Sequence, residues 1–382
     1  MFRTFCIAKA LAAYRYFVGA FFGGFFGISC AVLALLGSVP AQAQRLAASA
    51  ASAPSWATVP PFAGRLTAAQ IGLVINTADP YSVQVGEHYI ERRGLRPAQV
   101  LRLALPTRGT LTVEEFETLR NALAERFGPG IQALALAWVA PYAVGCNSIT
   151  GALALGHDAA LCQRSCGPSR PSPYFNSASA RPWTELGLRP SMLLAAPSVE
   201  QALALIDRGV AADGALRLRG RSPVSAMFLD TSDTARSVRK ALYPPTGLLR
   251  AVAVDVQRAP AVALKDARHV LLAITGSVKL DLAPAIDWVP GALADHLTST
   301  GGALDGQHGQ STALEWIASG ATASHGTVSE PCNHPQKFPH PQLLLRHYLQ
   351  GSTAIEAYWK SVAWPQQSLF IGEPLAAPFA TR

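Results

Sequence analysis

Several features that would identify a class of protein are scarce or missing in this chain. Its 31 glycines and 28 prolines in 382 residues make up about 15 %, whereas low-complexity and collagen-like chains need roughly 25–30 % or more. Beyond residue 43, no apolar run approaches the ~20 residues that a second membrane-spanning helix needs. The 32 lysines and arginines form no basic run with interleaved aromatic residues, so nucleic acid is not expected as a partner. The apolar content of 49 % is instead typical of a globular protein with a large core.

Motifs for nucleotide binding and for hydrolysis are missing as well. The glycines at 128, 130, 301 and 302 fit neither the P-loop nor the dinucleotide-binding pattern, so no nucleotide and no other cofactor is expected. There is no G-x-S-x-G nucleophile elbow. Asp295, His296 and Ser299 are nearly contiguous, and such residues on one helical turn do not converge as a Ser-His-Asp triad does. We therefore interpret this stretch as a helix cap and turn.

The N-terminus has the layout of an export signal. A start that is basic and free of acidic residues precedes the apolar run from Phe17 to Gly37, and Ala41-Gln42-Ala43 follows as a cleavage site. We predict a signal peptide at residues 1–43, a mature chain that begins at Gln44, and a periplasmic or secreted location. The alternative is an uncleaved membrane anchor, because the run is long enough to span a bilayer. Residues 44–66, rich in Ala, Ser and Pro, are expected to form a flexible lead-in.

Four cysteines remain in the mature chain: Cys146, Cys162, Cys166 and Cys332. An even number in an oxidising compartment indicates two disulfides, for which the sequence allows three pairings. We expect the neighbours Cys162 and Cys166 to pair, which leaves Cys146 with Cys332. The alternative is a metal site made by the C-x3-C pair with a third cysteine and a histidine, but no metal is our prediction.

Residues 67–380 alternate between strand and helix patterns. Apolar runs predict strands at residues 71–76, 100–105, 131–138, 225–229, 249–256 and 269–274. Capping boxes predict helix starts at Thr112, Thr312 and Thr353. The apolar positions Ala235, Val238 and Leu242 predict a further helix after Asp233. The alternation indicates an α/β domain with a largely parallel sheet flanked by helices. It fails at about residues 141–190, where we expect a long irregular insertion stapled by disulfide.

The strand predictions also indicate where a site would lie. In an open parallel sheet, ligands bind beyond the carboxyl ends of the strands. This rule selects five polar residues for one working crevice: Asp79, Tyr142, His296, His325 and Glu330. In the SPYFNS segment, Tyr174 and Asn176 have the polar and aromatic character of a binding loop, or equally of a packed loop anchor.

The stretch from His325 to His340 suggests two kinds of chemistry. Cys332 could be a nucleophile with His325 or His296 as its base, since an imidazole can hold a thiolate at neutral pH. His325, Glu330 and His334 could instead hold a metal ion for hydrolysis. We favour a structural interpretation, in which Cys332 is half of a disulfide and the prolines mark a loop.

Six long motifs resemble an uncharacterised family of exported bacterial proteins. They are INTADPYSVQVGEHYIERRG, SPYFNS, LIDRGVAADG, PGALADHLTSTGGAL, ASGATASHGTVSEPCNHPQKFPHP and EAYWKSVAWPQQSLFIGEPLAAPF, spread over roughly residues 67–380. This family occurs in species that carry the exosortase protein-sorting system, which handles proteins with a PEP-CTERM tail. The resemblance implies no established activity, and the last residues, Phe379 to Arg382, are not expected to be such a tail.

A more distant resemblance is to the caspase-like fold of gingipain-type cysteine peptidases. Leu369 to Pro374 is similar to their closing strand, which precedes a Gly-Asp-Pro. Where those enzymes have a His-Gly after one strand, this chain has Thr275-Gly276, and near Leu297 to Thr300 it has no cysteine in the place of the nucleophile. The resemblance therefore implies either a binding scaffold or a rearranged site.

We thus predict a non-catalytic exported binding or assembly factor linked to exosortase-type sorting, with an envelope protein, peptide or glycan as its partner. A cysteine peptidase that uses Cys332, or a metal-dependent hydrolase, is the alternative.

Overall fold

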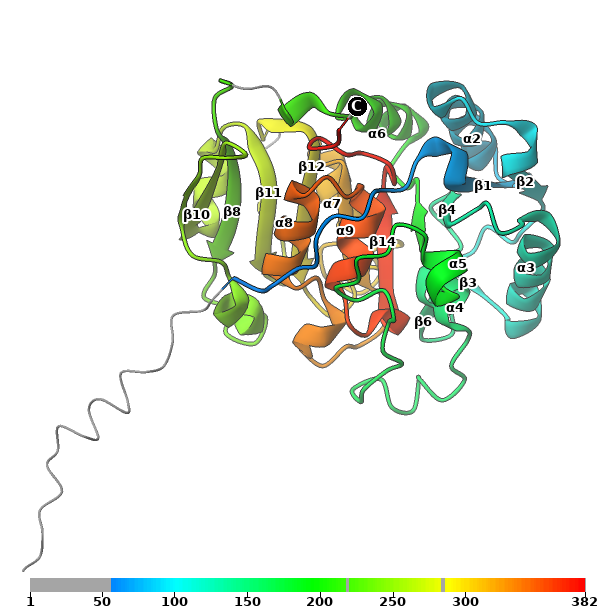
Figure 1. Cartoon of the computed structure of the whole chain (residues 1–382). Coiled ribbons are helices and arrows are strands. Elements are labelled where there is room, and N and C mark those ends of the chain that lie inside the picture. The colour runs from blue at the N-terminus through cyan, green and yellow to red at the C-terminus, as the bar shows by residue number, and fades with distance from the viewer. Residues whose placement is uncertain (1–55, 218–219, 283–285, 382) are drawn as a thin grey trace, which may run out of the picture. The chain divides into compact units, whose positions relative to one another are not determined.

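The strands that carry the fold form one 11-stranded sheet (Figure 1). The computed structural model describes residues 56–217, 220–282 and 286–381. Across the sheet the strands are β2 (Val100–Leu103), β1 (Ile71–Asn76), β4 (Ala133–Leu136), β7 (Ser191–Leu193), β14 (Ser368–Gly372), β13 (Ala323–Thr327), β12 (Trp288–Leu297), β11 (Val270–Gly276), β8 (Val224–Asp230), β10 (Val254–Pro260) and β9 (Gly247–Leu249). A second, three-stranded sheet contains β3 (Thr110–Leu111), β5 (Ala143–Val144) and β6 (Asn147–Ser148).

The large sheet consists of two parallel halves that run in opposite directions. Strands β2, β1, β4, β7 and β14 are parallel to one another and form the first half-sheet. Strands β13, β12, β11, β8 and β10 are also mutually parallel and form the second half-sheet. The halves meet where β14 pairs antiparallel with β13. Their carboxyl ends therefore lie at opposite edges of the sheet.

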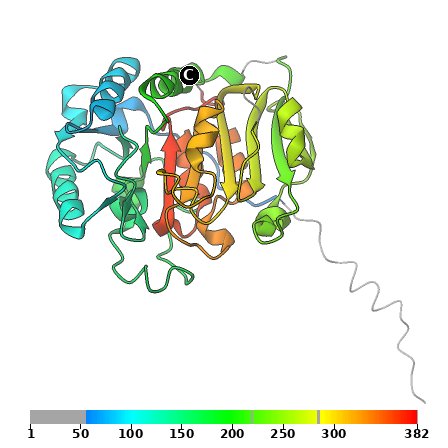
Figure 2. The same ribbon diagram turned by 180° about the vertical axis from the view of Figure 1, so that it is seen from behind.

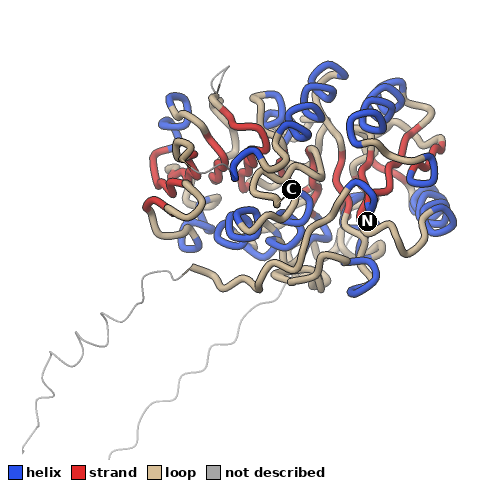
Figure 3. Tube along the Cα trace, turned by 45° about the horizontal axis from the view of Figure 1, so that its top comes forward, coloured by secondary structure: helices blue, strands red, loops and turns tan. Residues whose placement is uncertain are grey.

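Helices flank this sheet on both faces (Figure 3). They are α2 (Pro80–Arg93), α3 (Val113–Arg126), α4 (Ile149–Leu155), α5 (Pro182–Leu186), α6 (Val199–Ala211), α7 (Ala313–Ala318), α8 (Pro341–Leu349) and α9 (Ala354–Ser361). Short 3-10 turns add η1 (Ala68–Gln70), η2 (Pro97–Gln99), η3 (Ala215–Arg217), η4 (Ser237–Leu242), η5 (Ala261–Asp266), η6 (Pro335–Lys337) and η7 (Pro365–Gln367). The prediction of an α/β fold with a largely parallel sheet is confirmed.

Local chemistry explains where the helices begin and end. The predicted capping boxes are present at α3, α7 and α9, where Thr112, Thr312 and Thr353 precede the first turn. Asp79 caps α2 through its carboxylate, which accepts from the Tyr81 amide. The same helix ends at Gly94, whose φ of 63° is a left-handed conformation that glycine adopts without strain.

Three predicted elements differ from the observed ones. The single strand expected at residues 249–256 is two antiparallel strands, β9 and β10, because the chain turns at Ala253, where φ is 46°. The helix expected after Asp233 is the 3-10 turn η4. The stretch around Asp295 and His296, which we interpreted as a helix cap and turn, is the buried strand β12.

The structure describes only the last part of the predicted N-terminal lead-in. The predicted signal peptide, its alternative as an anchor, and residues 44–55 lie outside the described residues. Residues 56–66 of the predicted lead-in contact the folded domain. The Leu66 amide donates to the Glu356 carboxylate over 3.1 Å, and the Arg346 guanidinium lies 4.6 Å from the Trp56 ring centroid. The insertion predicted as irregular contains β5, β6, α4 and α5.

Candidate functional site

The four cysteines among the described residues form two disulfides, Cys146–Cys162 and Cys166–Cys332. The prediction that all four pair is confirmed, but the predicted partners are wrong. Cys162 and Cys166 lie in successive tight turns, in which the Arg164 amide donates to the Leu161 carbonyl and the Gly167 amide to the Arg164 carbonyl. These turns direct the two thiols to different partners. The disulfides indicate an oxidising, extracytoplasmic environment.

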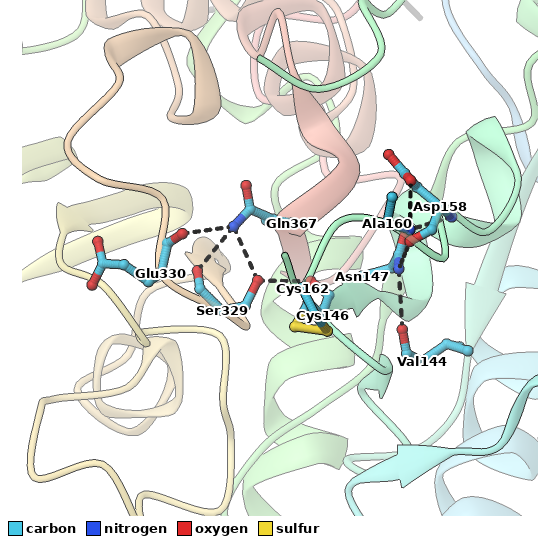
Figure 4. The surroundings of a disulfide bond; sticks show 9 residues. All are labelled: Val144, Cys146, Asn147, Asp158, Ala160, Cys162, Ser329, Glu330 and Gln367. Atoms are coloured by element: carbon cyan, nitrogen blue, oxygen red, sulfur yellow. Dashed lines mark hydrogen bonds between the residues drawn. A yellow bond between two sulfur atoms is a disulfide. The ribbon is translucent and has the colours of Figure 1, made fainter. Parts of the chain in front are cut away.

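The four cysteines lie in two segments, residues 145–170 and 328–340, which we call the stapled loops. Hydrogen bonds also join these two segments. The Ser329 hydroxyl donates to the Cys146 carbonyl over 2.7 Å. The side-chain amide nitrogen of Gln367, the last residue of η7, donates to the Ser329 hydroxyl over 3.0 Å and to the Glu330 carbonyl over 2.9 Å. Figure 4 shows these bonds around the Cys146–Cys162 disulfide. The loops are therefore held by covalent and polar contacts together.

A buried lysine strengthens the connection between the stapled loops. The Lys337 ammonium donates to the Ser165 carbonyl, and burial lowers its pKa to about 8. His334 donates from Nε2 to the Cys166 carbonyl over 2.6 Å. Glu330 is exposed, and its carboxylate accepts from the Cys332 amide over 2.7 Å. His334 and Glu330, which we considered as metal ligands, thus bind backbone groups of the loops.

His325 lies beneath these loops in a fully buried ionic cluster. Its Nδ1 is 3.1 Å from the Asp295 carboxylate, which is 2.5 Å from Nη1 of Arg239. Arg239 also donates to the carbonyls of Thr275 and Pro339. Burial opposes the charge of Asp295, but Arg239 and the hydrogen bond from His325 hold its pKa below the usual value. Burial lowers the pKa of His325 despite the nearby carboxylate.

His296 is buried beside this cluster with both ring nitrogens hydrogen-bonded. Its Nδ1 accepts from the indole of Trp316 and its Nε2 donates to the Ser311 carbonyl, each over 3.0 Å. This pairing requires the neutral ring, and burial lowers the pKa of His296. The ring serves as a packed link between β12 and α7.

The five residues predicted for one crevice do not all meet. His296 and His325 belong to the second half-sheet, and Glu330 follows its strand β13. Tyr142 belongs to the insertion, and its hydroxyl donates over 2.7 Å to Asp305, in the loop after β12. Asp79 follows β1 of the first half-sheet, so it lies at the opposite edge.

The SPYFNS segment places one aromatic side chain between two anchored ones. The buried Tyr174 donates to the Glu356 carboxylate over 3.4 Å. Asn176 donates to the Thr58 carbonyl and accepts from His347, both over 3.0 Å. Phe175 between them is 36 % exposed. Tyr174 and Asn176, predicted as binding residues, therefore hold the loop, and Phe175 is the side chain that it presents.

Phe175 forms one wall of an apolar hollow of about 320 Å³, which we call the Phe175 pocket. Its other main walls come from η4, from the second stapled loop and from the segment after α9. They are Val238, Leu242, Pro335, His340 and Ala363. Sequence reasoning missed this pocket, although an exposed aromatic residue between two hydrogen-bonding residues is a usable signal.

Sequence reasoning also missed two buried arginines. Arg239 lies next to apolar positions of the predicted helix after Asp233, where nothing distinguishes it from a surface residue. Arg93, at the end of α2, makes a two-point contact of 2.9 and 2.7 Å with the buried Glu373 and a 2.5 Å contact with Asp213. Both arginines have carboxylate partners far away in sequence.

Comparison with known proteins finds no matching family, curated protein or solved structure.

Neither a metal-binding cluster nor a membrane-spanning helix is found in the described part of the chain. No group of three or more His, Cys, Asp or Glu side chains there is arranged to hold a metal ion. None of the helices within residues 56–217, 220–282 and 286–381 has the length and hydropathy that crossing a membrane requires.

Proposed function

We propose that the protein is an exported binding factor that assists the assembly or sorting of other proteins at the cell envelope, without catalysis of its own. The N-terminal sequence pattern and the two disulfides support export to the periplasm or beyond. The sequence resembles a family of exported proteins from bacteria that carry the exosortase protein-sorting system, and this resemblance supports a role in protein sorting.

The observation that carries this proposal is the state of the groups that a cysteine peptidase would need. Cys332 is bonded to Cys166, so it holds no thiolate. Both nitrogens of His296 are hydrogen-bonded, and His325 is buried between the rings of Phe338 and Phe370. A nucleophile and its base must reach a substrate and each other. The caspase-like resemblance is accordingly proposed as a scaffold only.

We assign partner binding to the Phe175 pocket and the adjoining stapled loops. Pro335 and His340 belong both to the pocket and to the second stapled loop. The disulfides and the anchors Tyr174 and Asn176 hold this surface in place before a partner arrives, which lowers the entropy cost of binding. The apolar walls favour a polypeptide that inserts an aliphatic or aromatic side chain.

A direct test uses two fluorescent peptides of equal length and charge, one with a central leucine and one with a central serine. We expect the purified mature protein to prefer the leucine peptide and Phe175→Ala to remove that preference. Phe62→Ala is the matched control, because Phe62 is 38 % exposed and lies outside the pocket. Equal binding of both peptides, or equal effects of the two variants, would reject the pocket as the binding site.

The peptidase alternative is tested with the same peptides made fluorogenic. Cys166→Ser breaks the second disulfide but keeps Cys332 as a free thiol, whereas Cys332→Ser breaks it and removes that thiol. A binding factor shows no turnover in either variant. Turnover by Cys166→Ser that is absent in Cys332→Ser would establish Cys332 as a nucleophile and overturn the proposal.

A further inference from the structure

A second cavity lies at the edge of the second half-sheet that is remote from the stapled loops. It has a volume of about 600 Å³ and opens beside the amino ends of β8 and β10. The segments before these two strands, the end of α8 and the last described residues form its walls. In Figure 1 this edge lies at the top and the stapled loops lie at the bottom, and Figure 2 shows the same separation from behind.

Three arginines line this cavity: Arg217, Arg221 and Arg250. Gln350 and Thr381 add polar side chains, and the lining contains no aspartate or glutamate. Within the described residues, the ion pairs of the molecule involve other arginines. The cavity therefore concentrates positive charge that no carboxylate of the described chain neutralises.

Arg221 is fixed at the wall of the cavity. Its Nε donates to the Leu216 carbonyl over 2.8 Å, and its Nη1 and Nη2 donate to the carbonyls of Ser222 and Val252. A guanidinium has five N–H groups, so two of them take no part in these three hydrogen bonds within the described chain. Partial burial lowers the pKa of Arg221, as expected for a cation held away from water without a counter-charge.

The turn that carries Arg250 is also constrained. The Val252 amide donates to the Leu249 carbonyl over 3.1 Å, and Ala253 adopts a left-handed conformation with a φ of 46°. A residue with a Cβ rarely adopts this conformation. It closes the turn between β9 and β10 and brings Arg250 to the same cavity as Arg217 and Arg221.

We propose that this cavity binds a small oxyanion with two or more negative charges, of the phosphate or carboxylate class. Guanidinium groups bind such anions through paired N–H donors, and a concave site without acidic residues attracts them from solution. The volume is in the range of small-molecule sites, roughly 300–1,000 Å³. The site is separate from the Phe175 pocket, so this inference does not rest on the proposed function.

Titration calorimetry with inorganic pyrophosphate and with digalacturonate tests the two sources of charge, and maltose is the neutral control. We expect the wild-type protein to bind at least one of the two anions, more weakly as ionic strength rises, and not to bind maltose. The double variant Arg217→Gln/Arg250→Gln should bind that anion at least about tenfold more weakly, a loss of about 1.4 kcal/mol or more.

Two controls make the result specific. Arg181→Gln removes an exposed arginine outside the cavity and should leave the affinity unchanged. Arg250→Lys keeps the charge but loses the planar pair of donors, so its affinity should lie between those of the wild type and the double variant. The proposal is overturned if neither anion binds, or if the double variant binds as tightly as the wild type.

Discussion

At the scale of single residues, buried charge pairs hold distant parts of the chain together. Arg239 and Asp295 connect η4 to β12, and Arg93 and Glu373 connect the end of α2 to the residue after β14. Removal of one partner leaves a buried charge uncompensated, which typically costs about 3–5 kcal/mol. Exposed pairs contribute about 0–1 kcal/mol, because water screens them.

Arg93 and its neighbour Arg92 provide a matched comparison of these two cases. Arg93 pairs with the fully buried Glu373, whereas Arg92 pairs with Asp207 where both side chains are largely exposed. We expect Arg93→Ala to lower the free energy of unfolding by about 3–5 kcal/mol and Arg92→Ala by less than about 1 kcal/mol. Urea denaturation of the two variants measures the difference. Similar losses of unfolding free energy in the two variants would show that the buried pair stabilises the fold no more than the exposed pair does.

A second residue-scale prediction concerns acid sensitivity. Burial, with repulsion from Lys360, lowers the pKa of His347 to about 3, from an ordinary value of 6.5. Between these values the unfolded chain binds a proton that the folded chain does not. The free energy of unfolding should therefore fall as the pH decreases from about 6.5, by roughly 1.4 kcal/mol per pH unit for each such histidine.

Asp295 acts in the same direction at lower pH. Its pKa is lowered in the folded state, so its stabilising contribution is present above the unfolded pKa and is lost as the pH falls through the folded one.

Urea midpoints measured from pH 7.5 to 5 isolate the histidine effect. His347→Gln should reduce the pH slope. Identical slopes in the wild type and in His347→Gln would contradict the assignment.

At the scale of elements, the stapled loops depend on two crosslinks of different reach. Cys146–Cys162 spans 16 residues and Cys166–Cys332 spans 166. In the chain-entropy description of disulfides, removal of the shorter should cost about 3 kcal/mol and removal of the longer about 5 kcal/mol. Urea denaturation of the double variants Cys146→Ser/Cys162→Ser and Cys166→Ser/Cys332→Ser tests this order of stability losses.

Peptide mapping of a non-reduced digest tests the pairing itself. We expect one linked peptide pair that contains Cys146 and Cys162, and another that contains Cys166 and Cys332. A peptide in which Cys162 is linked to Cys166 would restore the pairing expected from sequence distance alone.

Most strands of the sheet can be predicted from sequence, but the site cannot. The apolar runs at residues 71–76 and 269–274 indicate β1 and β11, because strands buried on both faces need apolar side chains throughout. Strand β12 departs from this rule, since it carries Asp295 and His296 inside the core. Arg239 pairs with Asp295 and Trp316 donates a hydrogen bond to His296, and these contacts offset the cost of burying the two polar side chains. No local sequence pattern reveals these partners.

At the scale of the whole molecule, the reversal between the half-sheets decides which residues meet. The strand-end rule assumes one direction for all strands, and it therefore grouped Asp79 with His325. The antiparallel pairing of β14 with β13 places the carboxyl ends of β1 and of β13 at opposite edges. Strand order depends on contacts between distant segments, so it was beyond the reach of the sequence patterns.

Export is the prediction that concerns the complete chain. The basic start, the apolar run and Ala41-Gln42-Ala43 predict cleavage before Gln44. N-terminal sequencing of protein purified from fractionated cells should begin at Gln44, in the soluble periplasmic or secreted fraction. An intact Met1 in the membrane fraction would instead establish the N-terminal segment as an anchor.

The position of β14 has a consequence for the time at which the protein can fold. This strand lies in the middle of the sheet, between β7 and β13, yet 367 residues precede it in the chain. During synthesis neither β7 nor β13 can pair with β14 until these late residues leave the ribosome, so the middle of the sheet closes last. For the export proposed above, this late closure leaves the sheet open for most of the time in which the chain is made.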